Sequence, residues 1–167
     1  VYQDEQFRYL TKKLNGYITG AYIYNKMGLT EQVATTITIA TPNPVRRFRF
    51  KNLDIECVKA YCMVYPDESL VPYLRLLDAI KDMKRIPGTT GQDIYNRVKS
   101  QYFNGYSLPE LEKIVSLAKS YPPRVRKVVA DILGDIRQTV LQTEMAKTIL
   151  PTTRFNLDYK TRKTQLR

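Results

Sequence analysis

The sequence has no histidine and no tryptophan, and it has only two cysteines among its 167 residues. Without histidine the chain lacks the usual general base, the Ser-His and Cys-His nucleophile pairs and the commonest metal ligand. No apolar run reaches the length of about 18 residues that a membrane-spanning helix needs, and no basic-then-apolar signal peptide opens the chain. These absences exclude most hydrolase mechanisms and argue against a membrane-embedded protein.

The two cysteines, Cys57 and Cys62, lie five residues apart in a segment that we expect to be helical. On a helix this spacing places the two side chains about 140° apart around the axis. That separation is too large for a disulfide or for a shared metal. We therefore interpret both cysteines as small buried apolar residues.

Positive charge dominates the composition. The chain carries 27 Lys and Arg against 16 Asp and Glu, a net charge of +11, and its mean hydropathy is −0.39. Such an excess favours polyanionic partners, nucleic acid first and anionic membrane surfaces second. A hydrophobic content of 43% excludes a wholly disordered basic chain, and the length suits one domain with a single core.

The apolar residues mostly follow a helical period. Spacings of three and four, typical of amphipathic helices, occur over residues 3–27, 53–64, 70–83, 89–104, 108–120 and 123–150. Ser107 and Glu110 form a capping box at the start of one of these segments. The β-branched segment 33–40 fits either a strand or a helix, and residues 45–51 fit an extended chain. Between them, Pro42 and Pro44 interrupt regular structure.

These patterns predict an all-α fold with one helical core. We expect a compact bundle of four to five helices over residues 52–150, a helical or extended N-terminal arm over 1–51 that wraps nucleic acid, and a basic C-terminal tail over 151–167. Residues 52–121 contain equal numbers of basic and acidic side chains, so the positive excess comes from the arm, the last helix and the tail. Basic appendages on a neutral body favour nucleic-acid binding.

The candidate contacts to nucleic acid follow this distribution of charge. On the N-terminal helix one polar stripe holds the basic and polar candidates, with two glycines beside it that would let a phosphate backbone approach. A solvated face and a Gly-x-x-x-Gly helix contact remain alternatives. The candidates of the helix are Arg8, Lys12, Asn15, Gly16, Thr19, Gly20 and Lys26, and those of segment 45–51, which has no acid, are Arg46, Arg47, Arg49 and Lys51.

Further candidates lie toward the C-terminus. They are Arg124, Arg126 and Arg137 of the last helix and Arg162 and Lys163 of the tail. A solvated helix face paired with Asp131 and Asp135, and a disordered solubilising tail, remain the alternatives. The Gly88-Thr-Thr-Gly91 segment lacks the lysine of a phosphate-binding loop. We therefore expect no enzyme, no catalytic residues, no cofactor and no metal site.

The order of N-terminal arm, proline-containing bend and compact helical bundle resembles the major capsid proteins of filamentous archaeal viruses that infect hyperthermophiles. The resemblance implies a coat protein that wraps linear double-stranded DNA in A form, and it implies that two related subunits pair. On that basis the candidate contacts are the basic arm residues named above. The expected location is the virion, assembled in the host cytoplasm.

The expected function is thus a structural coat protein that packages linear double-stranded DNA without reading its sequence and self-assembles into a helical filament. The expected partners are duplex DNA, further copies of the chain and a related second subunit, with no small-molecule substrate. Contact with a membrane envelope is compatible with the positive charge. The alternatives are a non-enzymatic DNA-binding regulator or accessory protein, and a protein-interaction or matrix-type protein.

Overall fold

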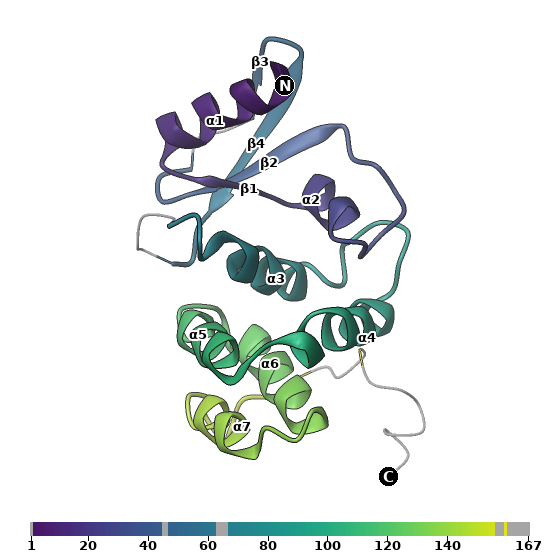
Figure 1. Ribbon diagram of the computed structural model, residues 1–167, viewed down its shortest axis with the longest axis vertical. Helices are drawn as coiled ribbons and strands as arrows, with labels where there is room; N and C mark the ends of the chain where they lie inside the picture. Colours follow the sequence, from purple (N-terminus) through teal and green to yellow (C-terminus); the bar gives the residue numbers. More distant parts are fainter. Residues whose placement is uncertain (1, 45–46, 63–66, 156–158, 160–167) are drawn as a thin grey trace.

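The computed structural model describes residues 2–44, 47–62, 67–155 and 159, and these residues form a mixed α/β fold (Figure 1). The strands are β1 (Tyr17–Thr19), β2 (Thr36–Thr41), β3 (Phe48–Phe50) and β4 (Leu53–Lys59). The helices are α1 (Tyr2–Leu14), α2 (Ala21–Lys26), α3 (Val71–Lys81), α4 (Gly91–Gln101), α5 (Leu108–Ala118), α6 (Pro123–Asp135) and α7 (Thr139–Ala146), with a 3-10 turn, η1, at Phe103–Gly105.

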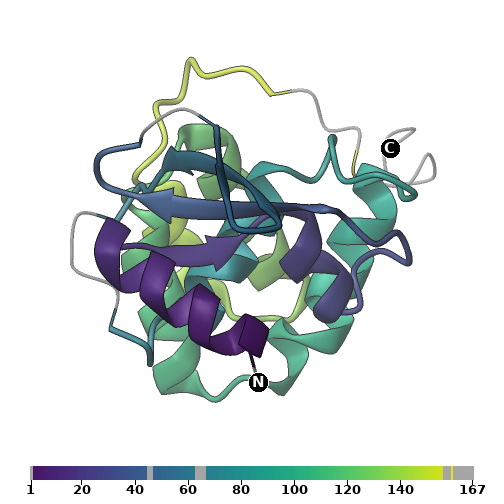
Figure 2. The ribbon, with the colours of Figure 1, turned by 90° about the horizontal axis from the view of Figure 1, so that it is seen from above.

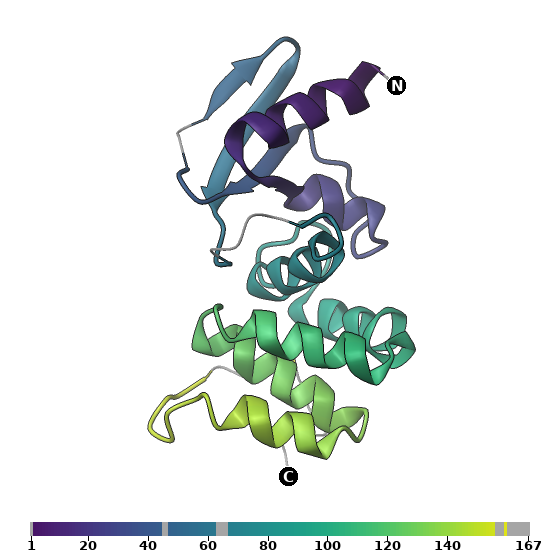
Figure 3. The ribbon, with the colours of Figure 1, turned by 60° about the vertical axis from the view of Figure 1, so that its left-hand side comes forward.

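The four strands form one mixed sheet in the order β1-β2-β4-β3. Strands β2 and β4 are parallel, whereas β1 and β3 pair antiparallel at the two edges. Ile18, Ile39 and Cys57 are in register and share one face of the sheet. Helix α1 runs across the sheet from β1 toward β3 (Figures 1 and 3).

Helix α3 is the central element of the fold. It lies between the sheet and the helical layer of α4 to α7 (Figures 1 and 3), and it contacts β1, α4, α5 and α6. Residues 76–80 of this helix are all buried. The sheet and the helices are therefore packed around one shared core, and the view from above shows the sheet stacked over the helices (Figure 2).

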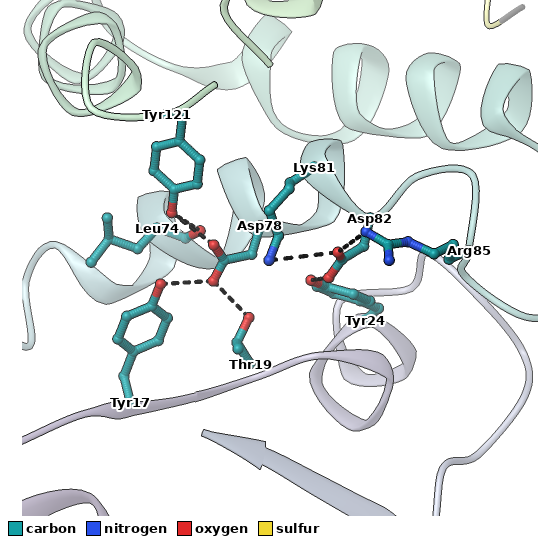
Figure 4. Close-up of polar contacts among 9 residues, drawn as sticks. All are labelled: Tyr17, Thr19, Tyr24, Leu74, Asp78, Lys81, Asp82, Arg85 and Tyr121. Carbon is teal, nitrogen blue, oxygen red and sulfur yellow. Dashed lines mark hydrogen bonds and ion pairs between the residues drawn. The ribbon is translucent and has the colours of Figure 1, made fainter. Parts of the chain in front are cut away.

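A buried carboxylate joins these layers. Asp78 of α3 is only 3% exposed, and it accepts hydrogen bonds from the hydroxyl groups of Tyr17 at 2.7 Å, Thr19 at 2.8 Å and Tyr121 at 2.7 Å (Figure 4). Burial raises the pKa of the Asp78 carboxyl, and the three hydroxyl donors oppose that shift. One turn along α3, the hydroxyl of Tyr24 donates to Asp82 at 2.7 Å. These bonds fix β1 and α2 on α3.

The all-α prediction is wrong, because two segments expected to be helical contain strands. Residues 53–59 form β4, in which Leu53, Ile55 and Cys57 share one face and Asp54 and Glu56 the other. The apolar spacing of four that predicted a helix here also keeps residues on one face of a strand, since four is a multiple of the two-residue period. The pairing of β4 with both β2 and β3 decided between the two structures.

The long helix expected over 3–27 is divided into α1, β1 and α2. Asn15 has a φ of 50° and Gly20 a φ of 81°, and both values lie in the left-handed region that interrupts a right-handed helix. The ambiguous segment 33–40 is resolved as β2. The expected N-terminal arm is therefore part of the sheet, and β1 and β2 pair within the same sheet as β4.

The helix expected over 123–150 is also divided. It ends at Asp135, Arg137 has a φ of 64°, and α7 begins at Thr139. Val140, which one continuous helix over 123–150 with the predicted apolar face would turn toward the core, is 80% exposed. The apolar spacing continues through the turn, so it gave no sign of the break.

The other helical predictions are confirmed within the described residues. Helices α3, α4 and α5 fall inside the predicted segments, and Ser107 and Glu110 make the predicted capping box. Cys57 lies on strand β4 and not on a helix, and both cysteines are half-buried and not in a disulfide, so the prediction of fully buried apolar residues is wrong. No helix in the described ranges combines the length and the apolar character needed to cross a bilayer.

Candidate nucleic-acid interface

A cleft of about 760 Å³ opens between α1, the edge strand β1 and the start of α3. Four of the predicted contact residues, Arg8, Lys12, Asn15 and Gly16, line it. On α1, Arg8 and Lys12 project to the same side, because positions four apart are neighbours on a helix surface, and Asn15 and Gly16 follow in the turn after the helix. A cleft of this volume accommodates a small anionic ligand or a short piece of a nucleic-acid strand.

Arg75 of α3 brings a third cation to the cleft. Its Nε donates a hydrogen bond of 2.8 Å to the carbonyl oxygen of Ile18, which fixes the side chain against β1. Desolvation lowers the pKa of the Arg75 guanidinium, while the nearby Tyr17 and Asp78 oppose the shift. The guanidinium is thus held in a partly dry position where an anionic ligand is favoured.

The three cations of the cleft are not neutralised by ion pairs within the ranges that the structure describes. Arg8 and Lys12 are exposed, and no carboxylate among the described residues lies within ion-pair distance of Arg8, Lys12 or Arg75. The cleft also contains the carboxylates of Asp4 and Glu68. Its charge is therefore mixed but positive in sum.

Three small residues of the predicted stripe have structural roles instead. A Cβ on Gly16 would lie 2.2 Å from the carbonyl oxygen of Ala40, so glycine is needed for the contact with β2. Gly20 has a positive φ and packs on Thr38. Thr19 is buried and donates to Asp78. The two glycines therefore allow a close approach to strand β2, whereas the sequence predicted a close approach to a phosphate backbone.

Replacing Gly16 with alanine is expected to lower the free energy of unfolding by about 1–3 kcal/mol, because the added methyl group must displace the main chain of β2. Chemical denaturation followed by circular dichroism measures the change. Gly91→Ala is the matched control, since nothing lies within 4 Å of a Cβ built at Gly91. Equal midpoints for the two variants would contradict the steric explanation.

The cations of segment 45–51 are partly neutralised across the sheet. Arg47 pairs with Glu56 at 3.3 Å and Arg49 with Asp54 at 3.9 Å. Both acids come from β4, outside the acid-free segment, so the sequence gave no sign of them. Lys51 adopts a positive φ of 54°, and its Nζ lies 5.6 Å from the centre of the Phe50 ring.

The remaining candidates are spread over the molecule. Lys26 lies over the Tyr22 ring at 5.0 Å, outside the cleft. Arg126 donates to the carbonyl oxygens of Tyr121 and Thr148 and so joins α6 to the end of α7. Arg137 lies in the turn after α6, so it is not in line with Arg126 along one helix.

Four predicted contacts remain, namely Arg124, Arg46, Arg162 and Lys163. Arg124 of α6 is half-buried, and its Nη2 has no hydrogen-bond partner. Arg46, Arg162 and Lys163 lie outside the described residues. The structure therefore brings only the candidates of α1 and of the turn after it together.

The sequence reasoning missed Arg75. It was counted among the balanced charges of the middle segment, whereas it stands alone as a cation in the apolar run Leu74-Arg-Leu-Leu77 of α3. A single charge within a buried helix needs a polar partner or a route to solvent. The position of Arg75 in an apolar run was therefore the sequence feature that could have identified it as a candidate for the cleft.

The described residues contain no group of three or more His, Cys, Asp or Glu side chains that is able to hold a metal ion. Comparison of the chain with protein-family models, with curated proteins and with solved structures gives no match. The residues that line the cleft are therefore the basis for assigning a function.

Proposed function

We propose that the protein binds nucleic acid without reading its sequence and that the cleft cations hold the sugar-phosphate backbone. The observation that supports this is the convergence of Arg8, Lys12 and Arg75 on one cleft with no ion pair among the described residues. Contacts to phosphate position a protein on a nucleic acid and carry no sequence information. The net charge of +11 adds long-range attraction to any polyanion.

Arg75 and the two α1 cations have different roles in this proposal. The bond from Arg75 Nε to Ile18 fixes the guanidinium, so its remaining N–H groups are oriented before a phosphate arrives. Arg8 and Lys12 are exposed and adapt to the position of the strand. Binding energy therefore comes from one fixed donor group and two mobile charges.

Packaging of linear double-stranded DNA as a viral coat is the most specific form of the proposal. It is supported by the basic composition and by the cleft. It also requires that many copies of the protein assemble into a filament. Three parts of it stay predictions: the second subunit, the location in the virion and the A form of the DNA. Electron microscopy of the protein mixed with linear duplex DNA tests it, because a coat protein forms filaments whose length follows that of the DNA.

Removing Arg8 and Lys12 together is expected to weaken binding to all sequences alike. If each contacts one phosphate, the slope of log affinity against log salt becomes shallower by roughly 2 for duplex DNA. Fluorescence anisotropy of a labelled duplex, titrated at several salt concentrations, measures the slope.

The matched control is the double variant Arg47→Ala, Arg49→Ala. It loses the same net charge, but from side chains that pair with Glu56 and Asp54 on the sheet. We expect its salt slope to stay near that of the unmodified protein. Equal losses of slope in the two double variants would show that total charge, and not the cleft, determines binding.

A further inference from the structure

An exposed tyrosine of α1 stacks on a half-buried phenylalanine of β3, on the side of α1 next to the residues that line the cleft. The rings of Tyr9 on α1 and Phe50 on β3 have centroids 5.5 Å apart and an interplanar angle of 16°. Tyr9 remains 52% exposed even though this contact covers part of its ring. We refer to Tyr9 and Phe50 as the aromatic platform.

A lysine ammonium group lies over each ring of the aromatic platform. Lys13 Nζ lies 5.7 Å from the centre of the Tyr9 ring, and Lys51 Nζ lies 5.6 Å from the centre of the Phe50 ring. An exposed π surface next to positive charge is the combination that single-stranded nucleic acids use, since bases stack on the ring while cations contact the phosphates. Charge complementarity therefore points to a nucleic-acid strand as the ligand of this surface.

The platform and the cleft lie on adjacent strips of α1. At about 100° per residue, Tyr9 is displaced from Lys12 by about 60° around the helix axis. The acidic residues of this helix, Asp4 and Glu5, lie in its first turn, whereas Arg8, Lys12 and Lys13 occupy the following turns. A strand that follows the basic part of α1 therefore passes both the cleft and the platform.

We infer that the aromatic platform stacks an unpaired nucleobase of the strand whose phosphates contact the cleft, so that a single-stranded segment gains a contact in addition to the phosphate contacts that it shares with duplex. This inference rests on the proposed function. In a duplex, the base faces are covered by their neighbours and only the end pairs present one. The platform therefore has a ligand surface in a single strand that an intact duplex lacks.

Anchoring of α1 does not account for the exposure of Tyr9. The helix is fixed on the body by Leu10, which is 2% exposed, and by the edge-to-face contact of Phe7 with Tyr22. The Thr41 hydroxyl also donates to the carbonyl oxygen of Leu14 at the end of the helix. These contacts do not use the ring of Tyr9, over which a base would take the place of the exposed Lys13 ammonium group.

The absence of tryptophan from the sequence allows a direct test. Tyr9→Trp keeps an aromatic ring on the platform and makes it the only indole in the protein. Val140→Trp is the control, because Val140 is 80% exposed and lies on α7 at the opposite end of the molecule (Figure 1). An unstructured oligothymidine and a blunt-ended hairpin duplex of equal phosphate number are the two ligands.

Oligothymidine is expected to quench the fluorescence of Tyr9→Trp strongly, the hairpin to quench it weakly, and neither to change that of Val140→Trp. Equal quenching of Tyr9→Trp by both ligands, or none while anisotropy still reports binding, would overturn the stacking inference and leave the proposed function standing. Absence of binding in the anisotropy measurement would overturn both. Circular dichroism confirms that each variant is folded.

A second comparison separates stacking from apolar contact. Tyr9→Leu keeps an apolar side chain against Phe50 but removes the π face, whereas Tyr9→Phe retains it. We expect Tyr9→Leu to bind oligothymidine about tenfold more weakly, with hairpin affinity and salt slope unchanged, and Tyr9→Phe to bind both like the unmodified protein. Equal oligothymidine affinities for the Leu and Phe variants would contradict the inference.

Discussion

Raising the pH from 10 to about 11 is expected to lower the free energy of unfolding by about 3 kcal/mol through three buried tyrosines, because each loses about 1 kcal/mol over the first pH unit above its unfolded-state pKa. Burial is the largest cause that raises the pKa of Tyr17, Tyr24 and Tyr121 above the ordinary value of 10.0, and the carboxylates of Asp78 and Asp82 add to it. Each of these tyrosines donates its proton to one of the two carboxylates, so ionisation would place two negative charges side by side.

The free energy of unfolding falls with rising pH because the pKa values of all three tyrosines are higher in the folded state than in the unfolded state. Below pH 10 the tyrosines are protonated in both states, and their contribution to stability is complete. Above pH 10 they ionise in the unfolded chain but keep their protons in the folded protein, so the unfolded state gains an advantage whose slope approaches about 1.4 kcal/mol per tyrosine and pH unit. The stability is lost progressively as the pH rises toward the folded-state pKa values.

Chemical denaturation at a series of pH values between 8 and about 11 measures this loss. Tyr24→Phe removes one of these groups, and its free energy of unfolding is expected to fall by about 1 kcal/mol less than that of the unmodified protein between pH 10 and about 11. Tyr9→Phe is the control, because Tyr9 is exposed and lies on the platform, away from these carboxylates. A free energy of unfolding that stays constant across the series would refute the assignment.

Replacing Asp78 with alanine is expected to destabilise the protein by about 3–5 kcal/mol at neutral pH. The substitution leaves the hydroxyl groups of Tyr17, Thr19 and Tyr121 without their acceptor in a region closed to water. It also disconnects β1 from α3, and the loss is therefore shared by both layers of the fold.

Urea denaturation of Asp78→Ala and of Asp54→Ala measures the difference. Asp54 is an exposed carboxylate 3.9 Å from Arg49, and its loss is expected to cost less than about 1 kcal/mol. Asp78→Asn retains one acceptor oxygen and is expected to fall between the two. If Asp78→Ala unfolds at the same urea concentration as Asp54→Ala, the buried hydroxyl groups do not depend on the carboxylate.

The sequence predicted the elements with strong end signals and missed those decided by distant pairing. The capping box at Ser107 and the prolines near the starts of α3 and α5 act within a few residues, and these helices are confirmed. Strand β4 depends on partners in β2 and β3. The apolar spacing along the sequence does not reveal these partners, because the same spacing fits both a helix and a strand.

The candidate site likewise combines residues that local spacing predicts with residues that only tertiary packing brings in. Arg8 and Lys12 come together because they share a face of α1, which the residue spacing predicts. Arg75 joins them only through the packing of α3 beside β1. The ion pairs of Arg47 and Arg49 likewise come from the neighbouring strand β4, so an acid-free segment was mistaken for an unneutralised one.

The bond between Arg75 and Ile18 also affects how the sheet behaves toward other molecules. An edge strand offers unpaired main-chain groups on which a strand from another chain can add, which is a common route to aggregation. At β1 one carbonyl oxygen already accepts from a guanidinium, and the positive charge beside it discourages an approaching apolar strand. Arg75 is thus expected to protect the edge of the sheet at the same place where the proposed function gives it a phosphate to bind.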